Sequence, residues 1–180
     1  DSSTWAELLH AQGYRTALCL PSSIFVADEP KVAPLRDRKL GFDVAYETDV
    51  PGRERPQQVA SYLAGIDRAT PVFAWVHLAE PNEPYEQQGE SFGSRDIDRY
   101  DSEIADADAT IALLVKVVRE RKPKTLVIIS GDHGEEFGEH GGRYHGTSVY
   151  EEQVHVPLVI HAPELFGPRR IKGTVATIDL

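Results

Sequence analysis

Three short apolar runs constrain the fold of this chain more than any other feature. They occupy residues 71–77, 125–130 and 156–161, and each is rich in large aliphatic or aromatic side chains. Runs of this length without polar and apolar alternation are typical of strands that are buried on both faces. Such strands need helices on both sides of the sheet, so the runs predict an α/β sandwich with a largely parallel, mixed central sheet.

Helical patterns alternate with these runs. The capping-box sequence Ser3-Thr4-Trp5-Ala6-Glu7 predicts a short helix that stops at Gly13, and residues 14–20 are expected to follow as a strand. A second helix is expected at residues 57–68. The longest helix should come after residue 95, where acids favour a helix start and apolar residues recur at three-four spacing. Its apolar stripe comprises Ile104, Ala107, Ile111, Leu114, Val115 and Val118, and irregular connections are expected at residues 21–41 and 81–95.

Composition narrows the class of protein. With 180 residues, 41% hydrophobic and 27% charged, the chain suits one globular domain, residues 1–180. No apolar run approaches the roughly 20 residues of a membrane-spanning helix. A net charge of −10 argues against a nucleic-acid surface. The single cysteine, Cys19, excludes an internal disulfide and a cysteine-rich zinc site, and the start at Asp1 without any methionine leads us to expect a piece of a longer product.

Two metal-ligand side chains follow the strand predicted at residues 125–130, in the sequence Gly131-Asp132-His133-Gly134. Ligands of open α/β sheets bind beyond the carboxyl ends of the strands. Adjacent side chains of a strand point to opposite faces, so Asp132 and His133 can share a ligand only where the chain has left the strand, which the flanking glycines permit. The pair then supplies half of a divalent-metal site. The alternative is a loop in which the pair only makes hydrogen bonds.

Two further histidines, His140 and His145, lie in the glycine-rich stretch that follows. Imidazolium groups and backbone amides in such a loop can hold an oxyanion. The alternative is a flexible polar loop in which the histidines have no common role. Glu135 and Glu136 either stand behind the metal ligands or are solvated, as adjacent glutamates in a loop usually are.

A longer pattern extends over about thirty residues around these positions, far more than a chance short motif. It comprises residues 127–141, then His145-Gly146-Thr147-Ser148-Val149-Tyr150-Glu151-Glu152 and Val156-Pro157-Leu158-Val159-Ile160. Further parts of it are Gly13-Tyr14-Arg15-Thr16-Ala17, Gly41-Phe42-Asp43, Phe73-Ala74-Trp75-Val76-His77-Leu78 and Tyr100-Asp101. In this order and spacing the chain resembles the sulfatase family of the alkaline phosphatase superfamily.

The resemblance implies an alkaline-phosphatase-like sandwich that hydrolyses sulfuric esters. It implies that Asp132 and His133 are ligands of a divalent metal, most often calcium, with manganese or zinc in related phosphoryl-transfer enzymes. His145 matches a position from which a basic side chain contacts the oxyanion of the ester, which makes it the expected catalytic residue. The positions that match the substrate-binding region are His77, Asn82 and His140. For His77 the alternative is a histidine satisfied by bonds at a strand end.

The sequence departs from the family pattern at three places, one of which is Pro21 and Ser23, where many arylsulfatases carry a lysine and a histidine. The family has a histidine next to Pro81, whereas this chain has Asn82, which can donate a hydrogen bond but cannot act as an acid. The run Cys19-Leu20-Pro21-Ser22-Ser23 is similar to the family's formylglycine motif, Cys-x-Pro-Ser-Arg. It follows a segment that in the family comes after the nucleophile, so we interpret Cys19 as a buried thiol and expect formylglycine and further acidic ligands upstream of Asp1.

These inferences together predict part of a sulfatase-like catalytic domain, completed by a missing N-terminal part of the same domain and inactive alone. Its partner would be a sulfate or phosphate ester; no nucleic acid and no membrane segment of this chain are expected. One alternative is a metal-dependent phosphoryl hydrolase or phosphoethanolamine-type transferase of the same superfamily. A second is a non-catalytic domain that keeps the fold. The sequence indicates no compartment.

Overall fold

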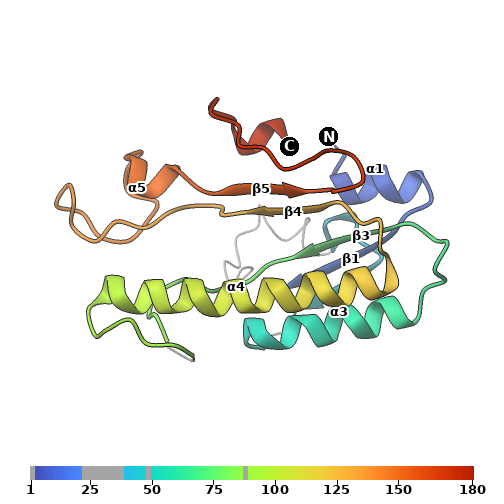
Figure 1. The fold of residues 1–180 in the computed structure, drawn as a ribbon, viewed down its shortest axis with the longest axis horizontal. Coiled ribbons are helices and arrows are strands. Elements are labelled where there is room, and N and C mark those ends of the chain that lie inside the picture. Colours follow the sequence, from blue (N-terminus) through green and yellow to red (C-terminus); the bar gives the residue numbers. More distant parts are fainter. Residues whose placement is uncertain (1–2, 22–38, 48–49, 87–88) are drawn as a thin grey trace.

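The computed structural model describes residues 3–21, 39–47, 50–86 and 89–180 (Figure 1). Its main elements are α1 (Trp5–Ala11), β1 (Arg15–Leu20), β2 (Val44–Glu47), α3 (Arg55–Ala64), β3 (Val72–Val76), α4 (Asp96–Arg121), β4 (Val127–Ser130), α5 (Glu151–Val154) and β5 (Leu158–His161). Short 3-10 turns occupy Lys39–Gly41, Gly52–Glu54 and Thr177–Asp179. None of the described helices has the length and hydropathy of a membrane span. The irregular connection predicted at residues 21–41 lies largely outside the described residues.

The strands form two sheets. β1 lies between β2 and β3 in a parallel sheet, with Ala17 opposite Val44 on one side and Ala74 on the other. β4 and β5 form a separate antiparallel pair in which Ile128 lies opposite Ile160. The predicted α/β fold with parallel and antiparallel strands is therefore confirmed. Among the described residues, however, the strands form two separate hydrogen-bonded sheets rather than one.

The main core lies between the parallel sheet and two helices that run side by side, α3 and α4 (Figure 1). β1 is buried along nearly its whole length, as the apolar pattern of this strand predicts. From its helix-facing side, Ala17 and Cys19 pack against the α3 residues Val59, Tyr62 and Leu63. Partly buried side chains around this cluster are Val44, Tyr46, Ile66, Val72, Val76, Leu114, Val117 and Val118. Burying a side chain such as Leu63 contributes about 2 kcal/mol of hydrophobic free energy.

The N-terminal helix begins and ends as the sequence predicts. The Thr4 hydroxyl oxygen accepts the Glu7 N–H at 3.2 Å, and the Glu7 carboxylate accepts the Thr4 N–H at 2.9 Å. Gly13 stops the helix with a backbone φ of 86°, which favours glycine. Asp43 then joins α1 to β1, because its carboxylate accepts the Thr16 N–H and lies 2.8 Å from His10 Nδ1.

The long helix α4 begins at Asp96, as expected, but its buried face differs from the predicted stripe. Leu114 and Val118 pack into the core, whereas Ile104 is 44% exposed. The part of the helix up to Thr110 instead buries Ser102, Glu103 and Thr110. The reason is that this part lies against the polar loop after β3, where the Glu103 carboxylate accepts the Asn82 N–H at 3.0 Å.

Lys122, directly after α4, holds the connection between α3 and β3. Its Nζ donates to the carbonyl oxygens of Asp67, Arg68 and Thr70 at 2.8, 2.8 and 2.6 Å. Arg121 adds a bond of 3.2 Å to the Leu63 carbonyl near the end of α3. Cationic donors thus add hydrogen bonds to carbonyl groups at a helix end and in a turn, two of which, those of Leu63 and Asp67, also accept a backbone N–H.

We predict that Lys122→Met lowers the free energy of unfolding by about 2 kcal/mol, because charge-assisted hydrogen bonds to backbone carbonyls are lost. Urea unfolding followed by circular dichroism measures the change. The matched control is Lys116→Met, at an exposed position of the same helix. Equal effects of the two substitutions would contradict the anchoring role of Lys122.

Candidate functional site

Asp132 and His133 follow the carboxyl end of β4, after the chain has left the strand. The Asp132 Oδ1 atom accepts the His133 N–H at 3.1 Å and lies 3.8 Å from His133 Nε2. The two side chains therefore share one side of the loop, as a common ligand requires. The Asp132 side chain is 72% exposed and that of His133 33% exposed, so both are accessible.

The ring orientation of His133 suits metal binding. Its Nδ1 atom lies 3.0 Å from the carbonyl oxygen of Gly134. Because a carbonyl oxygen can only accept, the neutral ring carries its proton on Nδ1, and the lone pair of Nε2 is on the side of Asp132. A carboxylate oxygen beside an imidazole nitrogen is a donor pair that fits a divalent cation. Within the described part of the chain, no group of three His, Cys, Asp or Glu side chains that could hold a metal ion occurs.

His77 lies at the carboxyl end of β3, close to this pair. Its backbone N–H donates to the Cys19 carbonyl at 2.8 Å. Burial lowers the pKa of His77; the Asp132 charge opposes that shift, and Arg55 and His133 add to it. The ends of the neighbouring strands β1 and β3 and the loop after β4 therefore meet at one place.

His145 is brought onto His133 although the two are twelve positions apart. Their rings stack with centroids 3.8 Å apart and an angle of 20°. The His145 Nδ1 atom lies 3.1 Å from Glu135 Oε1. On either side of His145 the backbone takes left-handed conformations, with φ of 71° at Tyr144 and 74° at Gly146, and these bends turn the ring inward.

A buried carboxylate folds this loop back on itself. Glu136 is 2% exposed, and its oxygens accept the N–H groups of His140 and Gly142 and the side-chain amide of Gln153. The backbones of Glu136 and Tyr144 also pair, with N···O distances of 3.0 and 2.8 Å. Burial opposes ionisation, but the bonds from Gln153, Gly142 and His140 outweigh it and lower the pKa of Glu136.

Helix α5 closes the loop from the other side. The Gly134 N–H donates to the Gln153 carbonyl at 2.8 Å. A Cβ atom at position 134 would collide with the carbonyl oxygen of Glu152, so only glycine fits between the loop and α5. This contact fixes the residue that directly follows His133.

The two remaining predicted site residues have other neighbours. His140 stacks on Tyr150 at 3.7 Å, and its Nδ1 lies 2.7 Å from the Glu152 carboxylate, so it is held by α5. Asn82 is exposed in the loop after β3, where its side-chain oxygen accepts the Glu83 N–H at 3.0 Å. Its backbone N–H is the group bonded to Glu103.

Sequence reasoning missed the partner of Glu135. Of the two alternatives for Glu135 and Glu136, the solvated one is wrong, because the two residues are 6% and 2% exposed. Glu135 also accepts the hydroxyl proton of Tyr85 at 2.7 Å. Tyr85, Tyr100 and Phe137 form an aromatic cluster with centroids 5.3 to 6.0 Å apart, which joins the loops after β3 and β4 to α4. No local spacing in the sequence indicates a partner that is fifty positions away.

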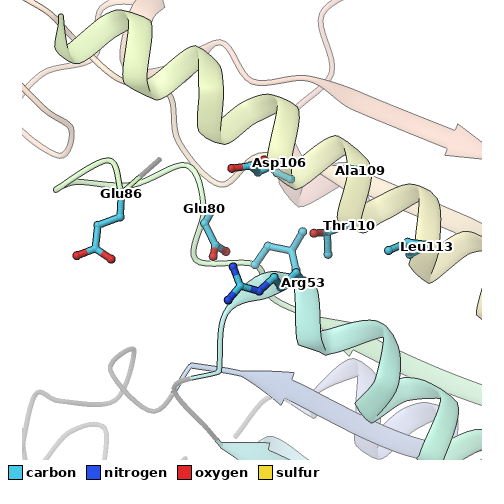
Figure 2. A pocket seen from close by; sticks show the side chains of 9 residues that line it. Arg53, Glu80, Glu86, Asp106, Ala109, Thr110 and Leu113 are labelled. Carbon is cyan, nitrogen blue, oxygen red and sulfur yellow. The ribbon is translucent and has the colours of Figure 1, made fainter. Parts of the chain in front are cut away.

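A cavity lies away from the histidines, between α4 and the loop after β3 (Figure 2). It holds about 160 Å³, and Arg53 and Glu80 face Asp106, Thr110 and Leu113 of α4 across it. Asp132, His133 and His145 do not line it. The candidate site is therefore the open surface around His133 rather than this cavity.

Comparison with known proteins agrees with this architecture. The Sulfatase family model matches residues 1–180. Bovine (Bos taurus) arylsulfatase K is 32% identical over 78 residues, which cover 42% of this chain and 14% of the enzyme. The crystal structure of yidJ from Bacteroides fragilis, a protein assigned to the sulfatases, matches with a TM-score of 0.74 at 18% identity, over 94% of this chain and 51% of that one.

A further structural neighbour is the C-terminal periplasmic domain of EcEptC from Escherichia coli, solved in complex with Zn. It matches with a TM-score of 0.65 at 15% identity, over 88% of this chain and 52% of that domain. At these identities the two structures show a shared fold. The chain spans about half the length of both structural neighbours.

We predict that Glu136 makes folding of this chain sensitive to acid. The pKa of Glu136 is lower in the folded state than its ordinary value, so its stabilising contribution is present above that ordinary value and is lost as the pH falls through the lowered one. The unfolding free energy should therefore fall less steeply on acidification in Glu136→Gln than in the wild type. The exposed Glu120→Gln on α4 is the control, and identical pH profiles for wild type and Glu136→Gln would refute the prediction.

Proposed function

Because the chain belongs to the sulfatase family, we propose that it forms part of the catalytic domain of a metal-dependent hydrolase of sulfuric esters. The observation that carries the proposal is the cluster at the end of β4, where the Asp132 and His133 pair lies under the ring of His145. Transfer of a sulfuryl group places negative charge on its oxygens, which a cation and a basic side chain stabilise.

Asp132 and His133 are the residues that would hold the metal. A divalent ion bound there would orient the nucleophile and offset the charge of the transferring group. Calcium is the ion that the family resemblance implies. The imidazole nitrogen also suits manganese and zinc, and the similar EcEptC domain was solved with Zn, so all three ions belong in the test.

His145 and His77 would have different roles towards the ester. With Nδ1 directed at Glu135, a protonated His145 has its second N–H, on Nε2, available for the ester oxyanion. The lowered pKa of His77 keeps that ring neutral near neutral pH, so we propose it as a hydrogen-bonding rather than a cationic contact. For Asn82 and His140, substrate binding is proposed on the resemblance alone.

Cys19 is a poor candidate for the nucleophile. It is 1% exposed, and burial raises its pKa to about 11 although Arg55 opposes the shift. At neutral pH its thiolate is therefore scarce and out of reach of an ester. We propose that the nucleophile, a formylglycine, is supplied by a part of the domain outside residues 1–180.

Exposed apolar side chains on both sheets support the proposal that a further part of the domain packs against them. Trp75 on β3 is 54% exposed, and Ile128 and Ile160, opposite each other on β4 and β5, are 48% and 41% exposed. Among the described strands, β3 and β4 each pair on one edge only. Large apolar side chains beside open strand edges are typical of surfaces that another segment covers. The yidJ structure is about twice as long as this chain, which is long enough to include such a segment.

A phosphoryl hydrolase or phosphoethanolamine-type transferase of the same superfamily is the second candidate. It is favoured by the Asp and His donor pair together with the zinc-bound neighbour of the same fold. The two functions differ in the nucleophile: formylglycine serves sulfate esters, and an unmodified threonine serves phosphoryl transfer. Turnover of an aryl sulfate against an aryl phosphate by the full-length protein separates them.

We predict that the chain binds a divalent metal weakly and that Asp132→Ala and His133→Ala each reduce the affinity at least about tenfold, because each removes a ligand. Calorimetric titration with calcium, manganese and zinc measures the loss. Asp108→Ala and His161→Ala, at exposed positions outside the cluster, are matched controls. Equal binding by the ligand variants and the controls would mean that the metal lies elsewhere.

We also predict that the 180-residue chain alone does not hydrolyse an aryl sulfate, because its only thiol is buried. A chromogenic aryl sulfate with each of the three metals present provides the assay. Turnover that Cys19→Ala abolishes would show that Cys19 is the nucleophile after all.

A further inference from the structure

The carboxylate of Glu135 is the least expected feature near the candidate site. It is 6% exposed, and its two oxygens have different partners: Oε2 accepts the Tyr85 hydroxyl at 2.7 Å, and Oε1 lies 3.1 Å from His145 Nδ1. Tyr85 belongs to the loop after β3. His145 lies ten residues after Glu135 in the loop that follows β4. A buried carboxylate with partners on both oxygens is held in place rather than free to rotate.

The direction of both hydrogen bonds follows from chemistry. An ionised carboxylate only accepts, so Tyr85 and His145 must both donate to it. Burial, reinforced by the hydrogen bond to Glu135, raises the pKa of Tyr85, which keeps the phenol proton available. The neutral His145 ring consequently carries its proton on Nδ1 and leaves Nε2 as the unshared nitrogen.

Several neighbours hold Glu135 and His145 in this arrangement. Tyr85 adopts a left-handed φ of 54°, which is unusual for a non-glycine residue and is found where surrounding contacts impose it. Its ring packs against Tyr100 and Phe137. The His145 ring in turn stacks on His133. His145 is thus held at Nδ1 by Glu135 and on one face of its ring by His133.

Glu135 and Glu136 have separate roles although they are adjacent and both buried. Glu136 accepts backbone N–H groups and the Gln153 amide, and so folds the loop. Glu135 binds two side chains, one of which is the expected catalytic histidine. Loss of Glu136 should disturb the whole loop, whereas loss of Glu135 should act mainly on His145.

We propose that Glu135, supported by Tyr85, is a positioning residue that fixes the tautomer and orientation of His145, so that Nε2 is presented to the ester. The role of Glu135 in catalysis rests on the proposed function, whereas the tautomer of His145 does not depend on it. A histidine whose Nδ1–H is held by a carboxylate is a recurrent way of aiming the second nitrogen at a metal or a substrate.

Long-range proton–nitrogen NMR correlation of the nitrogen-15-labelled chain tests the proposal without a substrate or metal. At alkaline pH, where the rings are neutral, wild-type His145 should show the Nδ1–H tautomer, with its signals assigned by their loss in His145→Gln. In Glu135→Ala the equilibrium should shift to the Nε2–H tautomer that predominates in free histidine. His133, held by the Gly134 carbonyl, is an internal control and should keep its Nδ1–H tautomer in both.

Glu135→Gln provides the matched variant. Its amide oxygen can still accept from His145, and the Tyr85 hydroxyl can turn to accept from the amide nitrogen, so the Nδ1–H tautomer should persist. Wild-type His145 in the Nε2–H form, or the same tautomer in wild type and Glu135→Ala, would overturn the proposal. Should Glu135→Ala not fold, the wild type and Glu135→Gln still decide it.

Kinetics of the full-length enzyme form the second arm. Glu135→Ala should lower kcat at least about tenfold with little change in KM or metal content, and Glu135→Gln should recover much of the loss. A change confined to KM would overturn the positioning role. If the full-length protein hydrolyses no ester, the proposed function fails while the NMR result for Glu135 stands on its own.

Discussion

The histidine-bearing loop depends on one buried carboxylate, that of Glu136. Its three hydrogen bonds reach forward along the chain to His140 and Gly142 and across to Gln153 on α5. Together with the backbone pairing of Glu136 and Tyr144, these bonds return the chain so that His145 lies over His133. Asp132 and His133 stand at the start of this loop, separated from the end of β4 by one residue.

A second constraint lies beneath the loop, where three segments far apart in the chain meet through aromatic rings. Tyr85 follows β3, Tyr100 belongs to α4, and Phe137 follows β4. The part of α4 that faces the loop after β3 buries polar residues such as Glu103 and Thr110 rather than an apolar stripe. The C-terminal part of the helix therefore packs against the hydrophobic core, and its N-terminal part packs against a polar loop.

Much of this architecture follows from local sequence, and the misses share a cause. The capping box at Thr4, the stop at Gly13, the long helix and the strands at β1, β3, β4 and β5 all reflect short-range preferences, and they were predicted. β2 and α5 are four residues each, too short for a periodic pattern to show. The placement of Asp132 and His133 on one side of a loop was also predicted, whereas the burial of Glu135 depends on a tyrosine that no nearby spacing reveals.

The glycine that follows His133 links two parts of the site mechanically. Gly134 touches the Glu152 carbonyl so closely that no side chain fits, and Glu152 is also the partner of His140. A shift of α5 would therefore be felt at both histidines at once, on one side through the backbone of Gly134 and on the other through the Glu152 carboxylate. The two cannot be adjusted independently, so sequence change in α5 should be tolerated only in coordinated sets.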